Sequence, residues 1–232
     1  MLNRYALTDP EFAERAQRFA CEEVARDAEA ALDGDTRHLA ILAALVGSQS
    51  KEVYREMLPL PLALDAGLSP VAVKEMVYQA VDYLGLGRTL PFLDITNEVF
   101  ALRSIAQPLE SQSTTTMDDR LEKGAQAQAA IFGEQMLEAW KAGTVNRWLA
   151  ANCFGDYYTR GGLDLKAREL ITFCFLAAQG GCEPQLVAHS QGNMNLGNGK
   201  DFLLRVILQI LPYIGYPRSL NAITCVNKAA EA

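Results

Sequence analysis

The stretch LDLKARELITFCFLAAQGGCEPQLVAHSQGNMNLG, residues 163–197, decides the fold and carries the candidate chemistry. Its apolar residues recur at helical spacing on both sides of Gly180-Gly181, and this spacing predicts two helices joined at a diglycine corner. Asp164 is a predicted N-cap for the first helix, and Cys182 is predicted to open the second.

Three side chains of the second helix, Cys182, Gln185 and His189, are spaced i, i+3 and i+7 and therefore share one face. The first helix carries Glu169. The corner is thus predicted to bring a carboxylate, a thiol and an imidazole together. The position of Cys182 at a helix N-terminus is expected to favour its thiolate.

The composition excludes several classes of protein. The chain has 232 residues, 50% of them apolar and 21% charged, which indicates a globular protein. A net charge of -7 and a pI near 5.0 argue against a nucleic-acid partner. The N-terminus MLNRYALTDPEF does not resemble a signal peptide, and no stretch is long and apolar enough for a membrane span. We therefore expect a cytoplasmic protein without a membrane partner.

Neither a metal nor a cofactor is expected. The five cysteines include no Cys-x-x-Cys pair, and two histidines cannot support zinc-finger spacing. There is also no glycine-rich phosphate loop. Reduced thiols in a reducing compartment are the simplest interpretation of the cysteines, which are Cys21, Cys153, Cys174, Cys182 and Cys225.

The rest of the chain also has helical periodicity, and the β-branched residues form no alternating runs. An all-α fold is predicted. Pro59 and Pro61 are expected to bend or split one of its helices, because proline lacks an amide donor. The expected helices cover about 10–32, 36–46, 51–66, 70–85, 89–104, 120–131, 133–141, 144–158, 164–179, 182–196, 200–213 and 217 onward.

An internal repeat divides the chain. The segment GLSPVAVKEMVYQAVDYLGLGR (67–88) aligns with GNGKDFLLRVILQILPYIGYPR (197–218), and LAILAALVGSQSKE (39–52) aligns with LITFCFLAAQGGCE (170–183). These matches predict one helical unit present twice about a pseudo-two-fold axis. We expect a degenerate N-terminal repeat at 1–105, a polar linker at 106–119 and a C-terminal repeat at 120–232.

The second half resembles the carboxymuconolactone decarboxylase family, which includes the alkylhydroperoxidase D-like proteins. The resemblance rests on FGDYYTRGGLDLKARELITFCFLAAQGG (154–181), QLVAHSQGNMNLG (185–197) and YIGYPRSLNAI (213–223), with FGE at 132–134 extending it. It implies an all-helical bundle that assembles as a homo-oligomer and acts on a small molecule.

The chain departs from both branches of that family. The peroxidase branch uses Cys-x-x-Cys followed by histidine, but this window reads Cys182-Glu183-Pro184-Gln185, so Gln185 replaces the second thiol. The decarboxylase branch has glutamate before Leu-x-x-His, and Gln185 stands there as well. His189 is retained, and Glu169 lies where the peroxidase-like members carry their glutamate.

The leading hypothesis from this resemblance is a cofactor-free carboxy-lyase acting on a small carboxylated lactone or related acid. His189 would donate the proton, and Glu169 would set its tautomer or shuttle its proton. Arg160 would anchor the substrate carboxylate, with Gln185 as a further substrate-binding residue.

Two alternatives stay open. The protein is a thiol peroxidase or redox sensor if Cys182 acts as a nucleophile activated by His189 and Glu169, with Cys174 or a partner supplying the resolving thiol. It is a non-catalytic oligomeric accessory protein if the pocket is vestigial.

Overall fold

The computed structural model describes residues 2–62 and 67–231, and every regular element in those ranges is a helix, as predicted. None of the described helices is both long and apolar enough to cross a membrane. The first half contains η1 (Asn3–Tyr5), α1 (Pro10–Arg18), η2 (Phe19–Glu23), α2 (Val24–Arg26), η3 (Ala28–Ala30), α3 (Gly34–Gly47), α4 (Lys51–Met57), α5 (Pro59–Leu62), α6 (Pro70–Leu84) and α7 (Leu86–Leu102). The second half contains α8 (Arg120–Phe132), η4 (Glu134–Ala142), α9 (Thr144–Trp148), η5 (Leu149–Tyr158), α10 (Leu165–Gln179), α11 (Glu183–Asn195), α12 (Lys200–Ile214) and α13 (Tyr216–Ala230).

The starts of the central helices follow from side-chain caps. Asp33 accepts a hydrogen bond from the Thr36 amide at the start of α3. Asp164 does the same for the Ala167 amide at the start of α10. Each cap satisfies a backbone donor that the first helical turn leaves free, so the predicted cap at Asp164 is confirmed.

Several predicted boundaries were wrong for local reasons. The first helix ends at Arg26 and does not reach residue 32, because Asp27 is extended and its side chain caps the Glu29 amide. The helix expected at 51–66 is split at Leu58, before Pro59, as its prolines predicted, and its last four residues lie outside the described ranges. The 133–141 segment is a 3-10 helix, and residues 149–158 are π-helical.

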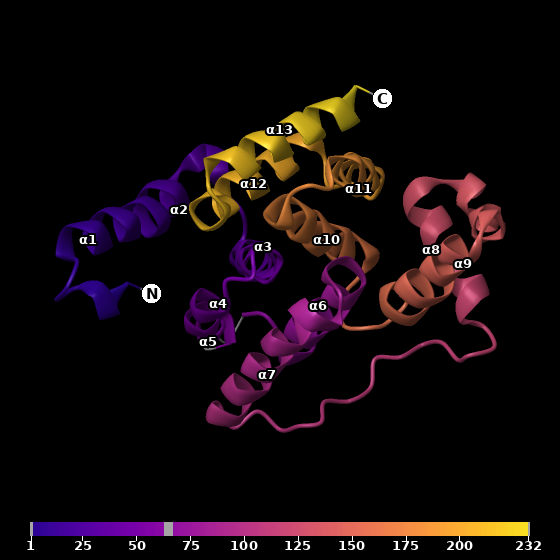
Figure 1. Cartoon of the computed structure of the whole chain (residues 1–232), viewed down its shortest axis with the longest axis horizontal. Helices are drawn as coiled ribbons and strands as arrows, with labels where there is room; N and C mark the ends of the chain where they lie inside the picture. Colours follow the sequence, from indigo (N-terminus) through magenta and orange to yellow (C-terminus); the bar gives the residue numbers. More distant parts are fainter. Residues whose placement is uncertain (1, 63–66, 232) are drawn as a thin grey trace.

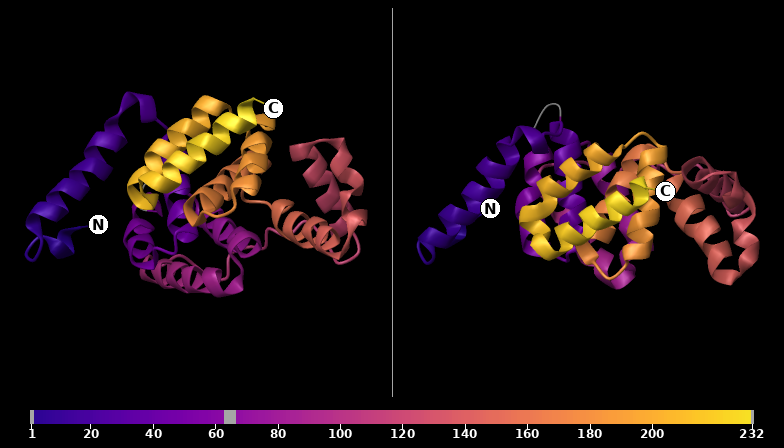
Figure 2. Two further views of the ribbon diagram at one scale, coloured as in Figure 1. Left: turned by 45° about the horizontal axis from the view of Figure 1, so that its top comes forward. Right: turned by 90° about the horizontal axis from the view of Figure 1, so that it is seen from above.

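The core joins both halves of the chain. One cluster of buried apolar side chains runs from Leu39 to Phe100 and from Leu170 to Val226, with α3 packed against α10. A smaller cluster lies in the lobe formed by residues 120–158, and it includes Ile131, Phe154 and Tyr158. Figures 1 and 2 show this lobe at one end of the molecule and α1 projecting at the other, with the shared bundle between them.

The predicted linker connects α7 to the lobe as an extended thread without helix (Figure 1). It is held at specific points, since Thr114 Oγ1 donates to the Thr159 carbonyl and Thr115 Oγ1 donates to the Gly155 carbonyl. The segment is therefore attached along its length to the turn that precedes α10.

Residues matched in the internal alignment make reciprocal contacts between the halves. Arg168 of α10 donates to Gln79 Oε1 of α6 at 2.9 Å. Arg37 of α3 donates to Gln209 Oε1 of α12 at 2.7 Å. A duplication about a pseudo-two-fold axis predicts such exchanged pairs, and the duplication itself stays a prediction.

Candidate functional site

The diglycine corner has the backbone geometry that its sequence predicts. Gly180 and Gly181 have φ values of 69° and 72°, a conformation that side-chain-bearing residues adopt only with strain. The chain reverses there, so that α11 packs against α10. Cys182 is the residue that precedes α11, and Pro184 lies in its first turn, as predicted.

His189 and Glu169 form the centre of the site. The imidazole Nδ1 lies 2.8 Å from Glu169 Oε2, and the glutamate is fully buried whereas the imidazole is 12% exposed. Asn193 fixes the two helices, because its amide donates to the backbone carbonyls of both residues, at 2.9 Å and 2.8 Å. The other ring nitrogen, Nε2, has no hydrogen-bond partner among the described residues.

A glycine allows α11 to approach α10 this closely. A Cβ at Gly192 would lie 2.8 Å from Glu169 Oε2 and 2.8 Å from side-chain atoms of Ile131 and Phe132. These distances are shorter than van der Waals contacts, so even alanine would push the carboxylate or the lobe away.

Tyr158 holds the second oxygen of the glutamate. Its hydroxyl donates to Glu169 Oε1 at 2.8 Å and lies 2.7 Å from the hydroxyls of both Thr172 and Tyr83. Burial raises the pKa of both tyrosines well above the usual value, so they stay neutral hydrogen-bond donors. Glu169 thus has a hydrogen-bond partner at each of its two carboxylate oxygens.

The hydrogen bonds continue into the shared core. Gln79 Nε2 donates to Thr172 Oγ1 at 2.9 Å, and Gln79 Oε1 accepts from Arg168. Arg168 is fully buried and also donates to Glu75 at 3.0 Å. An unbroken polar chain therefore runs from the ion pair between α6 and α10 to the imidazole.

A cavity of about 650 Å³ opens beside His189. The imidazole is held at its edge by the rings of Tyr83 and Phe132, whose centroids lie 5.5 Å and 5.4 Å from it in T-shaped contacts. Most of the wall is apolar, and it comprises Asp82, Tyr83, Gln128, Phe132, Met136, Leu149, Phe154, Leu176, Gln179, Cys182, Gln185, Ala188 and His189. The first half of the chain therefore contributes to the site through α6.

The predicted face of α11 does line this cavity, since Cys182, Gln185 and His189 all belong to its wall. The thiol of Cys182 is half-buried and lies 3.5 Å from both Gln179 Nε2 and the Leu176 carbonyl oxygen. Burial raises the pKa of this thiol, which is the opposite of the direction expected from its place at the helix N-terminus. Desolvation is the main cause, and the negative charge of Glu183 adds to it, while the hydrogen bond from Gln179 opposes it.

Arg160 lies elsewhere. Its guanidinium makes a bidentate contact with Glu75, at 2.9 to 3.1 Å, and stacks over the ring of Tyr78. It is absent from the cavity wall. The structure thus brings together four of the five predicted site residues, with Glu169 directly behind His189, and leaves Arg160 bound to another partner.

The other thiols differ from one another in setting. Cys174 is fully buried in the core, and burial raises its pKa. Cys153 lies beside the site, with its sulfur 3.8 Å from the Tyr83 hydroxyl. Within the described ranges, no three His, Cys, Asp or Glu side chains are grouped so as to hold a metal ion.

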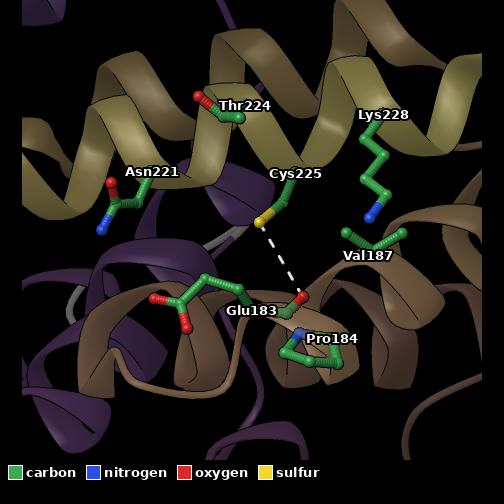
Figure 3. Close-up of a pocket in the computed structure, with 7 residues that line it drawn as sticks. All are labelled: Glu183, Pro184, Val187, Asn221, Thr224, Cys225 and Lys228. Atoms are coloured by element: carbon green, nitrogen blue, oxygen red, sulfur yellow. Dashed lines mark hydrogen bonds between the residues drawn. The ribbon is translucent and has the colours of Figure 1, made fainter.

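A separate cavity of about 660 Å³ lies between α11 and α13 (Figure 3). There the thiol of Cys225 points to the Glu183 carbonyl oxygen, 3.8 Å away, and Lys228 closes one side. None of the predicted site residues lines this cavity.

Sequence reasoning missed the supporting residues from outside the corner. The contacts of Tyr158, Tyr83, Thr172 and Asn193 had no local signal in the sequence. One signal did exist for Tyr83 and Gln79: both are identical to their partners in the internal alignment, Tyr213 and Gln209.

Comparison with known families identifies the second half. Residues 144–228 match the model of the Carboxymuconolactone decarboxylase family, a range that covers α9 to α13 and contains all five predicted site residues. No curated protein shows a significant match to the chain. The match to this family is confined to residues 144–228, and that range includes the His189–Glu169 pair.

Proposed function

We propose that this protein is a cofactor-free carboxy-lyase that acts on a small carboxylated lactone or related acid. The proposal rests on the contacts of the His189 imidazole. His189 is tied through Nδ1 to the buried Glu169, while its Nε2 has no partner among the described residues and the ring lines a mostly apolar cavity. That is the arrangement of a side chain ready to exchange a proton with a bound molecule.

The chemistry follows from this arrangement. The bond between the substrate carbon and its carboxylate breaks, carbon dioxide leaves, and the electron pair moves into the conjugated carbonyl to give an enolate. His189, as an imidazolium, then gives its Nε2 proton to carbon and recovers a proton from solvent. Glu169 stabilises the imidazolium by its charge and by the Nδ1 hydrogen bond, and the apolar wall limits solvation of the carboxylate.

Release of carbon dioxide from 4-carboxymuconolactone tests this proposal. Purified wild-type protein and a Cys182→Ala variant are expected to release it, and His189→Ala is expected to be inactive. His38→Ala serves as the matched control, since it removes the only other imidazole. Wild-type release no faster than that of His189→Ala would count heavily against a lyase.

A thiol peroxidase is the second candidate, because the Cys182 sulfur shares the cavity with His189. The raised pKa of Cys182 and the burial of Cys174 weigh against it, since a protonated nucleophile and an enclosed resolving thiol both slow such a cycle. Mass spectrometry after mild peroxide treatment separates the two candidates. Oxidation of other thiols with Cys182 unmodified would exclude the peroxidase, and inertness in both assays would favour the non-catalytic accessory protein.

The proposal includes a homo-oligomer in the cytoplasm. Large apolar side chains are exposed at the starts of α7 and α13, namely Leu86, Leu90, Tyr216 and Leu220. Such groups are typical of subunit contacts. All five cysteines are unpaired, which suits a reducing compartment. Sedimentation as a monomer at micromolar concentration would contradict the oligomer.

A further inference from the structure

Two polar side chains in the wall of the His189 cavity have atoms without partners. Gln128 of α8 is 2% exposed, and its Oε1 has no hydrogen bond among the described residues. Asp82 of α6 has a buried Oδ2 that likewise lacks a partner. Leaving such groups unpaired destabilises the fold, so two of them on one cavity wall indicate a place for a ligand.

The surroundings of Asp82 hold its carboxyl group in the neutral form. Burial raises its pKa to about 7, and the negative charge of Asp156 adds to this effect, while the Cys153 thiol opposes it. Tyr157 and Tyr83 also lie near it, on η5 and on α6 itself. Two arginines of the described chain that could approach it are bound to other carboxylates, since Arg120 pairs with Asp156 and Arg160 pairs with Glu75.

The cavity wall contains no lysine or arginine. An anionic ligand therefore cannot be held there by an ion pair with a wall residue other than His189. The wall also contains the amides of Gln179 and Gln185 and the hydroxyl of Tyr83. Asp82 and Gln128 differ from these in having a buried polar atom without a partner. A neutral carboxyl group and a primary amide can both donate to a carboxylate. Rotation of the Gln128 amide turns Nε2 into the position assigned to Oε1, which its exchangeable atoms permit.

We propose that Asp82 and Gln128 form a carboxylate-binding subsite, in which Asp82 donates its carboxyl proton and Gln128 donates an amide hydrogen to the ligand. The inference rests on the proposed function for the identity of the ligand, and it gives Asp82 and Gln128 the task that the sequence assigned to Arg160. The shared proton makes ligand binding depend on the protonation of Asp82.

The subsite also restricts the class of substrate. Hydrogen bonds to the carboxylate that is lost would stabilise the ground state and slow the reaction. The subsite is therefore suited to a carboxylate that stays in the product, with the departing carboxylate in the apolar part of the cavity.

Binding of a stable probe tests the subsite without turnover. The probe is 5-oxotetrahydrofuran-3-carboxylic acid, a lactone with one carboxylate, and its affinity for the full chain is measured by calorimetry at pH 6 and pH 8. The probe is ionised at both values, whereas Asp82 loses its proton between them. Wild-type affinity is expected to fall about tenfold from pH 6 to pH 8, given a pKa of about 7.

Variants separate the subsite from its neighbours. Asp82→Asn keeps a donor but cannot ionise, so it is expected to bind the probe equally at both pH values. Asp82→Ala and Gln128→Leu are expected to weaken binding at pH 6 at least tenfold. His189→Ala is expected to bind the probe more weakly, because the ring lines the cavity, but to keep the tenfold fall from pH 6 to pH 8, which excludes the imidazole as the source of the pH dependence. Thermal unfolding confirms that each variant is folded.

The outcomes are distinct from those of the lyase assay. Retained probe binding in a protein without turnover leaves the subsite intact and removes only the lyase. Wild-type affinity that does not change with pH, an Asp82→Ala variant that binds normally, or tighter binding of the corresponding 3-hydroxymethyl lactone would each overturn the subsite.

Discussion

Helices α3 and α10 have similar first turns, but the residue that follows the arginine differs between them and makes different contacts. Each starts after an aspartate cap, carries an arginine four residues after that cap, and pairs this arginine with a glutamine from the other half of the chain. The next residue is His38 in α3 and Glu169 in α10. His38 Nδ1 lies 2.7 Å from the Gly34 carbonyl oxygen of its own helix, whereas Glu169 binds two side chains of other elements.

The turns that follow α3 and α10 also share a backbone geometry although their residues differ. Gly180 has a φ of 69°, and Gln49, its partner in the internal alignment, adopts 61° despite its side chain. The backbone geometry is therefore similar where the sequence no longer favours it. The helical arrangement is therefore similar in the two halves, whereas the His189–Glu169 pair lies in the second half.

The largest expected effect separates the two histidines. His189→Ala is expected to lower the rate of carbon dioxide release by about 10²–10⁴-fold, the usual contribution of a general acid. His38→Ala is expected to leave the rate within about twofold, because that ring faces its own helix. Equal losses of rate in His189→Ala and His38→Ala, measured in a steady-state assay, would contradict this difference between the two histidines.

The two arginines are expected to differ in their contribution to stability. Arg168→Met leaves Glu75 with Arg160 as its only partner, and it also removes a donor from Gln79. We expect a loss of about 3 kcal/mol in the free energy of unfolding, from the range for breaking a buried pair. Arg37→Met is expected to lose about 1 kcal/mol, because that side chain is only half-buried. Urea denaturation measures both, and a larger loss at Arg37 would contradict the comparison.

Asp82 is expected to make the free energy of unfolding depend on pH. Its pKa in the folded protein is about 7 against 3.8 as the reference, so between these values the unfolded chain ionises and the folded protein does not. Native Asp82 thus destabilises the fold progressively as pH rises from about 4 to about 7, and the full cost is present above that window. Asp82→Asn is expected to be more stable than wild type at pH 8, by roughly 1–3 kcal/mol. The difference should vanish near pH 4, and stabilities that run parallel from pH 4 to pH 8 would refute the burial of this carboxyl.

The smallest effect concerns Tyr83 and its aligned partner Tyr213. Tyr83 bonds Tyr158, whereas the buried hydroxyl of Tyr213 has no partner in the described chain. Tyr83→Phe is expected to cost about 1 kcal/mol, the net value of one hydrogen bond, and Tyr213→Phe to be neutral or slightly stabilising. The reverse order in thermal unfolding would show that the two positions are not distinguished by their contacts.

Much of the frame was predictable because helix signals are local. Asp164, the glycines at 180 and 181, and the face shared by Cys182, Gln185 and His189 were all evident from spacing within one stretch. The first helix was expected to reach residue 32, but it ends at Arg26, because Asp27 is extended and its side chain accepts a hydrogen bond from the Glu29 amide. One hydrophobic core contains residues from both halves. We therefore propose that the division into 1–105, 106–119 and 120–232 reflects a duplication of the sequence and not two separate cores.

The site was less predictable because its partners are distant in sequence. Tyr83 lies 75 residues from Tyr158, and Glu75 lies 85 residues from Arg160. Arg160 was assigned to a substrate because an arginine in a turn lacks a visible partner in sequence. The buried glutamate that binds it comes from the other half of the chain, and only the packing of α6 against α10 brings the two together.

The protonation of one ring tests the central claim most directly. The chain has two histidines, so a His38→Gln variant leaves a single imidazole for nitrogen-15 NMR. We predict that Nδ1 carries the proton of the hydrogen bond to Glu169, and that the Nε2 resonance moves when the lactone probe is added. A proton on Nε2 in the neutral ring, or an Nε2 resonance that does not respond to a bound probe, would contradict the account.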